Sequence, residues 1–389
     1  MKVFVIAGEV SGDKLGQAVM AGLNTLRPGV SFDGVGGGLM QAEGLVSRFD
    51  MAELSVMGLV EILPKYRHFK RRIAQMAAAV TDYAPDVLLT IDSPDFCLRV
   101  ARAAKAANPG LRCVHYVAPT VWAWRPGRAA KMAQYIDQVL ALLPFEPPYM
   151  QAAGMACDFV GHPVVTDPVA SEAQAQAFRA GLDLGKAPLI LALPGSRRGE
   201  VSRLAGRFGQ ALRLVMAVHP QARVVVPCAA PVAGLVRDLT ADWPGPPVLI
   251  APDDPDSKRA AFRAADVALA ASGTVSLELA ANGTPMVIAY DLAWLSRIIM
   301  ARLLLVDTVT LVNLVSDTRV VPEFIGTRCR PDLMAASLLQ VLADPQAQKA
   351  AMALTMQRLG QGAEPPGLRA ARAILAGLGA RTPGNLPRT

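Results

Sequence analysis

Short apolar runs alternate with helix-forming stretches along most of the chain, and this alternation restricts the fold more than any other feature. Continuous aliphatic and β-branched runs with helices between them are typical of parallel sheets whose two faces are both covered. The sequence therefore predicts an α/β protein. The runs lie at residues 3–7, 87–91, 113–117, 139–143, 189–193, 224–227, 248–251, 267–270 and 286–289.

A segment rich in glycine and proline, residues 161–168, separates the runs into two groups. A length of 389 residues corresponds to two or three domains at about 150 residues each. We expect two Rossmann-like, doubly wound domains that face a cleft, residues 1–165 and 166–389. The second ends in a helical C-terminal tail, whose last helix can pack back on the first domain.

Composition excludes several classes of protein. Hydrophobic residues make up 52% of the chain and charged residues 18%, which indicates a folded core and not a disordered chain. No apolar run reaches the roughly 18 residues that a membrane span needs. The N-terminal apolar run lacks a signal-peptide cleavage pattern and is typical of a first strand, so we expect a cytoplasmic protein.

The cysteines and the net charge narrow the choice of partners. The five cysteines are scattered and include no CxxC pair, which indicates reduced, mostly buried thiols and no zinc site. A net charge of +7 suits an anionic partner such as a phosphorylated metabolite or an acidic lipid. No motif typical of nucleic-acid readers is present, so we expect no nucleic acid partner.

The most informative motif ends the apolar run at 189–193. Gly195, Ser196 and Arg197 form a turn between a strand and a helix, where backbone N–H groups and a fixed cation can bind an anion. A second turn of this kind, residues 270–278, contains a carboxylate, Glu278, that can accept from both hydroxyls of a ribose. Together the two turns predict a nucleoside diphosphate bound by the C-terminal half. The small residues of the second turn are Ser272, Gly273 and Thr274.

The N-terminal half has glycine-containing loops after its first strands. Residues 7–13 include Ser11, Gly12 and Asp13, which are equally well explained as helix N-caps. Residues 34–38 are rich in glycine but lack the spacing of a dinucleotide-binding fingerprint. Two such loops at adjacent strand ends favour a ligand that approaches the backbone closely.

Two carboxylates follow the apolar run at 87–91. Because Pro94 restricts the residue before it, we expect Ser93 to be extended and Asp92 to lie at the strand tip. Asp95 is more simply explained as a capping residue of the following helix. Asp92 is the better candidate for a general base, because a strand-end carboxylate in a closing cleft can have a raised pKa.

Aromatic and polar residues are interleaved at residues 115–125, which contain His115, Trp122 and Trp124. An aromatic core patch would explain them, as tryptophan often packs inside. A loop with this mixture fits a sugar or acyl-chain platform better.

A stretch at residues 57–72 has apolar residues at helical spacing and a strongly basic following face. A basic amphipathic helix on a membrane surface has this pattern. A core helix with a solvated face has it too, and is commoner. Pro64 favours an exposed or irregular element.

These motifs resemble those of a known family, the bacterial lipid-A-disaccharide synthases, which are inverting glycosyltransferases of the GT-B type. The resemblance runs in order from residue 3 to about residue 325. The most specific block is HYVAPTVWAWR at 115–125. The other blocks are AGEVSGD (7–13), GVGG (34–37), MQAEG (40–44), MGLVEIL (57–63), IDSPDF (91–96), LLPFE (142–146), FVGHP (159–163), LPGSRRGEV (193–201), ASGTVSLE (271–278) and LVNLV (311–315).

The resemblance implies transfer of 2,3-diacylglucosamine from UDP to 2,3-diacylglucosamine 1-phosphate, which yields a β-1,6-linked disaccharide and UDP in lipid A biosynthesis. It implies Asp92 as the base and Asn313 as part of the UDP pocket, with no metal and no cofactor. It also implies residues on the acceptor side and an apolar patch for the acyl chains. The acceptor-side residues are Glu9, Ser11, Asp13, His115, Trp122, Trp124 and Arg125, and the patch is Val60, Ile62, Leu63, Tyr66 and Phe69.

The same resemblance implies a peripheral protein on the inner face of the bacterial inner membrane, whose anionic surface is an expected partner; a homodimer is a further candidate. The chain departs from the family at Arg198, a second cation, and after Tyr290, where many relatives carry a basic residue. The resemblance therefore assigns no contacts with the donor to residues 290–294.

Two other functions compete with the transferase. A UDP-N-acetylglucosamine 2-epimerase shares the architecture and binds UDP, but has no use for a basic apolar helix or a tryptophan-rich loop. A membrane-associated nucleotide-binding module would not depend on Asp92.

Overall fold

The computed structural model describes residues 1–54, 59–292 and 303–379, and of residues 59–66 the backbone only. The chain divides into two compact units. Unit 1 comprises Met1–Pro163 and Gly362–Thr389, and unit 2 comprises Val164–Gln361. The last helix thus belongs to the first unit, whereas the predicted domain of residues 166–389 includes it as a helix that can pack back on the first domain.

Unit 1 is built on a six-stranded parallel sheet in the order β2-β1-β3-β4-β5-β6. Strand order reverses at β1, which has β2 on one side and β3 on the other. The strands are β1 (Lys2–Ala7), β2 (Ser31–Val35), β3 (Val87–Ile91), β4 (Arg112–Tyr116), β5 (Gln138–Ala141) and β6 (Ala156–Phe159). The helices are α1 (Val10–Leu26), α2 (Gly38–Ala42), η1 (Met51–Leu54), α3 (Leu59–Tyr83), α4 (Pro94–Ala107), α5 (Gly127–Met132), α6 (Pro147–Gln151) and α16 (Pro366–Gly379).

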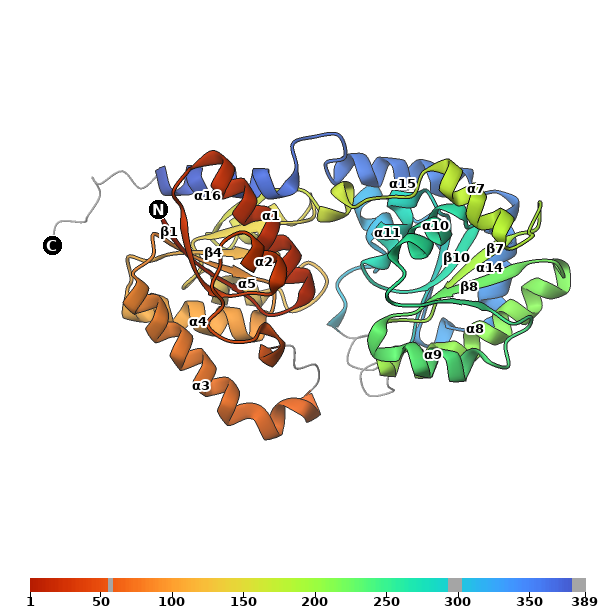
Figure 1. Cartoon of the computed structure of the whole chain (residues 1–389), viewed down its shortest axis with the longest axis horizontal. Helices are drawn as coiled ribbons and strands as arrows, with labels where there is room; N and C mark the ends of the chain where they lie inside the picture. The colour runs from red at the N-terminus through yellow and green to blue at the C-terminus, as the bar shows by residue number, and fades with distance from the viewer. Residues whose placement is uncertain (55–58, 293–302, 380–389) are drawn as a thin grey trace. The chain divides into compact units, whose positions relative to one another are not determined.

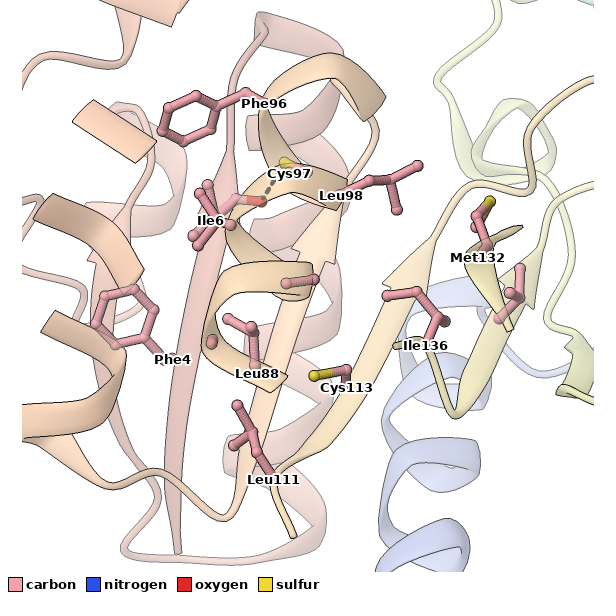
Figure 2. Packing of buried hydrophobic residues seen from close by; sticks show 14 of the residues in the cluster. Phe4, Ile6, Leu88, Phe96, Cys97, Leu98, Leu111, Cys113, Met132 and Ile136 are labelled. Atoms are coloured by element: carbon pink, nitrogen blue, oxygen red, sulfur yellow. Dashed lines mark hydrogen bonds between the residues drawn. The ribbon is translucent and has the colours of Figure 1, made fainter. Parts of the chain in front are cut away.

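The core of unit 1 lies on both faces of its sheet. Alternate residues of β1 point to opposite faces: Phe4 and Ile6 pack in one cluster, and Val3 and Val5 in the other. Figure 2 shows the first cluster, in which the Cys97 thiol donates to the carbonyl oxygen of Ile6 at 3.7 Å. Burial on both faces explains why these strands are continuous apolar runs.

The last helix, α16, packs against α1, as Figure 1 shows at the two ends of the colour scale. The helices are so close that a Cβ on Gly367 would lie 2.4 Å from the carbonyl oxygen of Ala18. Two side-chain hydrogen bonds also hold α16: Gln138 donates to the Ala373 carbonyl at 3.1 Å, and Arg369 donates to the Phe159 carbonyl at 2.7 Å. The C-terminal helix therefore completes the first unit.

Unit 2 repeats the architecture, with a parallel sheet in the order β12-β11-β10-β7-β8-β9. Strand order reverses at β7, between β8 and β10. The strands are β7 (Leu189–Leu193), β8 (Arg223–Pro227), β9 (Val248–Ile250), β10 (Val267–Ala271), β11 (Met286–Tyr290) and β12 (Glu323–Ile325). The helices are η2 (Pro163–Thr166), α7 (Glu172–Gly181), α8 (Arg198–Val218), η3 (Ala230–Val232), α9 (Ala233–Thr240), α10 (Pro255–Ala264), α11 (Val275–Asn282), α13 (Leu311–Ser316), η4 (Gly326–Arg328), α14 (Pro331–Ala343) and α15 (Gln346–Arg358).

The predicted α/β class with two doubly wound units is confirmed, and each predicted apolar run forms a strand. Of the two alternatives expected at Pro64, an exposed or an irregular element, the irregular one is wrong, because α3 runs through position 64. The proline removes one backbone hydrogen bond of this 25-residue helix, and the helix continues past it. No helix in the described ranges combines the length and the apolar character that crossing a bilayer requires.

Candidate active site

A cavity of about 620 Å³ opens at the carboxyl edge of the unit 2 sheet. It lies beyond β7, β8 and β10, where the strand order reverses. Doubly wound sheets bind ligands at this place, because loops on either side of the reversal leave a crevice. The lining includes seven predicted UDP-binding residues, which are Gly195, Ser196, Arg197, Ser272, Gly273, Thr274 and Glu278.

The first loop of this cavity requires glycine at its turn. Gly195 has φ +122°, a conformation that side-chain-bearing residues rarely adopt, and a Cβ there would lie 2.6 Å from the Cβ of Glu200. The next residues, Ser196 and Arg197, are exposed, and the Arg197 side chain retains 63% of its accessible surface. The guanidinium is therefore accessible to an anion in the cavity.

The backbone amides of this loop are not open, contrary to the sequence prediction. The Glu200 carboxylate accepts from the amides of Ser196 and Arg197 at 3.2 and 3.3 Å, and the Arg197 guanidinium donates to it at 3.4 Å. A carboxylate near the start of a helix satisfies donors that have no partner within the helix. Glu200 was not singled out from the sequence, although its position three residues after the N-cap is a capping signal.

The second loop carries a carboxylate and a cation that face each other. Lys258 of α10 donates to Glu278 of α11 at 3.0 Å, and both residues line the cavity. Both side chains are partly exposed, so the pair can exchange partners with a ligand. Sequence reasoning missed Lys258, because no motif surrounds it and only the packing of α10 beside α11 brings it here.

Asn313 does not line the cavity, so the structure does not support its predicted contact with UDP. Its side chain is only 1% exposed. The amide donates to the Val321 carbonyl at 2.9 Å and to Glu323 at 3.0 Å, and its oxygen accepts from the Val321 amide at 3.0 Å. Asn313 therefore stabilises the segment that leads to β12.

The chain after β11 is fixed by ion pairing. Asp291 is buried and pairs with Arg207, while Arg203 donates to its carbonyl at 3.0 Å. Burial raises the pKa of the neighbouring Tyr290 hydroxyl, and the Glu200 carboxylate raises it further. Trp294 lies outside the described residues.

The corresponding edge of unit 1 carries Asp92, directly after β3. Its amide donates to the Tyr116 carbonyl at 2.9 Å, which fixes the strand end, and its side chain is half-buried. Burial raises the pKa of the Asp92 carboxyl, while a hydrogen bond from the Ser93 amide lowers it. Partial burial therefore raises the affinity of the Asp92 carboxylate for a proton, which is the property that a general base needs.

The turn after Asp92 differs from the sequence prediction. Ser93 is left-handed, with φ 40° and ψ 55°, and not extended. Asp92 is left-handed too, with φ 49°. Because Pro94 already disfavours the right-handed helical region at Ser93, a tight turn from β3 into α4 leaves the left-handed region.

Asp13, predicted on the acceptor side, is a structural residue. Its buried carboxylate accepts from the amides of Gly37, Leu39 and Met40 at 2.9, 3.1 and 3.1 Å. These are the free donors at the start of α2, so Asp13 caps that helix from a distance. It does not cap its own helix, α1, which begins at Val10.

The other acceptor-side residues of the first loop remain accessible. Glu9 is half-buried and Ser11 is exposed.

His115 lies within the sheet and not in the loop. It is 1% exposed, and its Nδ1 is 2.8 Å from the hydroxyl of Thr90. Burial lowers the pKa of His115 to about 3, so the ring is neutral. The predicted acceptor contact is therefore replaced by a hydrogen bond between β3 and β4.

Of the two tryptophans in the predicted platform, one is buried. The Trp122 indole donates to Glu146 at 3.3 Å and packs edge-on against Phe145, with ring centroids 5.1 Å apart. Trp124 is half-buried, and the exposed Arg125 lies over its ring at 4.2 Å. Of the four site residues predicted in this segment, Trp124 and Arg125 stay accessible to a ligand, whereas His115 and Trp122 are buried.

The predicted acyl patch lies on α3, and most of it falls outside the described side chains. The side chains of Val60, Ile62, Leu63 and Tyr66 are among those not described. Phe69 is half-buried and packs edge-on against Phe96 with centroids 5.3 Å apart, so its ring contacts the core.

Basic residues follow the patch along α3. Arg67 and Arg71 are exposed. Arg72 is bound to Glu53 at 2.7 Å. In the described ranges, no group of His, Cys, Asp and Glu side chains could hold a metal ion.

Two doubly wound units, with a nucleotide-sized cavity at the strand reversal of the second, define a protein of GT-B architecture. Solved structures agree on the fold. A UDP-N-acetylglucosamine 2-epimerase from Neisseria meningitidis has a TM-score of 0.62 at 13% identity and covers 98% of this chain and 100% of its own. A glycosyltransferase from Rickettsia africae has a TM-score of 0.58 at 12% identity, with 98% and 99% covered.

Sequence comparison identifies the family. Residues 3–371 match the model of the lipid-A-disaccharide synthetase family. The lipid-A-disaccharide synthase of Ruegeria pomeroyi is 65% identical over 96% of this chain and 95% of its own length, and that of Rhodospirillum centenum is 43% identical over 96% and 94%. The chain belongs to the lipid-A-disaccharide synthetase family and is a glycosyltransferase. The alternative interpretation as an epimerase is supported by similarity of the fold alone.

Proposed function

We propose that the chain transfers 2,3-diacylglucosamine from UDP to the 6-hydroxyl of 2,3-diacylglucosamine 1-phosphate. The products are the β-1,6-linked disaccharide 1-phosphate and UDP. The observation that carries this proposal is the 65% identity to the Ruegeria pomeroyi synthase along almost the whole of both chains. The cavity of unit 2 supports it, because its lining suits a nucleoside diphosphate.

The donor is held by unit 2. Arg197 neutralises the diphosphate, and the hydroxyls of Ser196 and Ser272 donate to it. Glu278 releases Lys258 and accepts from the ribose hydroxyls. As the bond from the sugar to UDP breaks, Arg197 and the start of α11 stabilise the charge that develops on the leaving phosphate.

The acceptor is activated by Asp92. Its carboxylate takes the proton of the 6-hydroxyl while the oxygen attacks the anomeric carbon, and the electron pair of the breaking bond leaves with UDP. A single displacement of this kind inverts the anomeric configuration. The raised pKa of Asp92 strengthens the carboxylate as a base.

Four residues remain as acceptor contacts: Glu9, Ser11, Trp124 and Arg125. Support for them is their accessibility at or after the carboxyl ends of β1 and β4. Arg125 suits the 1-phosphate of the acceptor, because guanidinium binds phosphate strongly.

The protein is further proposed to lie on the inner face of the inner membrane as a peripheral protein. Both proposed substrates carry acyl chains, and the net charge of +7 favours an anionic surface. Co-sedimentation with anionic but not with neutral vesicles is the expected result. A homodimer also remains a proposal, which sedimentation velocity tests.

The function is tested by supplying UDP-2,3-diacylglucosamine and 2,3-diacylglucosamine 1-phosphate to the purified protein in detergent. We expect disaccharide and UDP in equal amounts. Folded protein that forms no disaccharide contradicts the proposal. Epimerisation of UDP-N-acetylglucosamine without any acceptor would support the alternative enzyme.

A further inference from the structure

Gly8 and Asp92 leave neighbouring strands at the same level of the unit 1 sheet. The register pairs Ala7 of β1 with Ile91 of β3, so the next residues of the two strands lie side by side. This is also where the strand order of unit 1 reverses. The loops here lie at the edge where doubly wound sheets bind ligands.

There is no room for a side chain at position 8. A Cβ on Gly8 would stand 2.5 Å from the Oγ of Ser93 and 2.9 Å from its Cβ. Rotation of the serine side chain could relieve the first contact but not the second, because the Cβ is fixed by the backbone. Any residue other than glycine at position 8 therefore displaces the backbone of Ser93.

The Ser93 backbone is held in a conformation that it does not favour. Asp92 and Ser93 have φ values of 49° and 40°, in the left-handed region that L residues rarely adopt. In the described part of the chain, the buried Ser93 hydroxyl has no hydrogen-bond partner. The serine side chain therefore adds no hydrogen bond that would hold the turn. The turn can adopt this position because Gly8 has no side chain to occupy the space.

We infer that Gly8 is a positioning residue for the general base: the missing side chain at position 8 lets the Ser93 turn hold the Asp92 carboxylate toward the acceptor. The inference rests on the proposed role of Asp92. The turn and the carboxylate are directly linked along the backbone, because Ser93 follows Asp92 and both residues are held in the left-handed region. Gly8 acts on the carboxylate through the Ser93 turn.

A double-variant cycle tests the inference with the full chain and both acylated substrates. Gly8→Ala should lower kcat by about 100-fold, the loss expected for a reacting group displaced by about 1 Å. The KM for the UDP donor should stay unchanged, because unit 2 binds it. Ser93→Gly removes the two atoms that the new methyl group would approach to less than 3 Å, so Gly8→Ala/Ser93→Gly should recover most of the kcat of Ser93→Gly alone.

Gly206→Ala is the matched control, since Gly206 is exposed on α8 and a Cβ there meets nothing within 4 Å, and its kcat should equal that of the wild type. Failure of the double variant to recover kcat overturns the inference. If Gly8→Ala does not fold, recovery of folding by Ser93→Gly supports the contact, and its absence overturns it. Asp92→Asn separates the two hypotheses: full activity of this variant rejects the proposed base, whatever the cycle shows.

Discussion

The predicted site residues differ in accessibility between the carboxyl edges of the two sheets. In unit 2, seven of the eight predicted UDP-binding residues line one open cavity, and Asn313 is the exception. In unit 1, Asp13, His115 and Trp122 are buried and hydrogen-bonded within the protein. The difference teaches that a loop motif made of turn residues can leave its side chains accessible even where its backbone amides are satisfied, whereas a motif made of aromatic and long-range polar residues can serve the fold.

The strongest test of this difference is Asp92→Asn. It removes the base while it keeps the shape of the side chain, so kcat should fall by about 10²–10⁴-fold. Asp95→Asn is the matched control, because Asp95 is exposed in the first turn of α4. Steady-state assays with both substrates measure the effect. Equal losses of kcat in the two variants would contradict the role of Asp92 as the general base.

The buried carboxyl of Glu146 makes the stability of unit 1 depend on pH. Burial raises the pKa of Glu146 from 4.5 to about 7. The stability that this carboxyl contributes is complete below pH 4.5 and is lost as the pH rises to 7, by on the order of 3 kcal/mol.

Glu146→Gln should abolish that loss, because the amide does not ionise. Urea unfolding of both proteins at pH 4.5 and 7.5 measures it, and His115 contributes equally to both and cancels in the difference. An unchanged difference between the two pH values would contradict the assignment.

Arg197→Ala tests the accessible UDP site that is predicted in unit 2. Loss of a hydrogen bond to a charged group should weaken UDP binding by roughly 1.5–3 kcal/mol. Arg198→Ala is the control, since Arg198 is the next residue in the chain and is exposed but is not among the residues that line the cavity. Isothermal titration with UDP compares the two, and similar losses would show only a general effect of charge.

The smallest effect is expected for Asn313→Ala. Removal of its buried amide should lower the free energy of unfolding of unit 2 by about 2 kcal/mol, because the amide of Val321 and the carboxylate of Glu323 lose a partner. UDP affinity of the folded variant should not change. A large loss of UDP affinity at full stability would restore Asn313 to the UDP site.

The strands and the unit 2 loops could be predicted because their signals are local. The run at 189–193 and the turn that follows it need only neighbouring residues to be interpreted. The cap that Asp13 makes on α2 could not be predicted, because its partners lie more than twenty residues away. The pair of Lys258 and Glu278 depends on helix packing, and the left-handed turn at Ser93 depends on the geometry of two neighbouring strands.

The central claim is a division of labour: the edge of unit 2 binds the donor, and Asp92 of unit 1 performs the proton transfer. Titration of UDP into Asp92→Asn tests it most directly. The account predicts a Kd equal to that of the wild type in a protein that no longer forms disaccharide. Loss of UDP binding together with activity, in a variant that is fully folded, would contradict it.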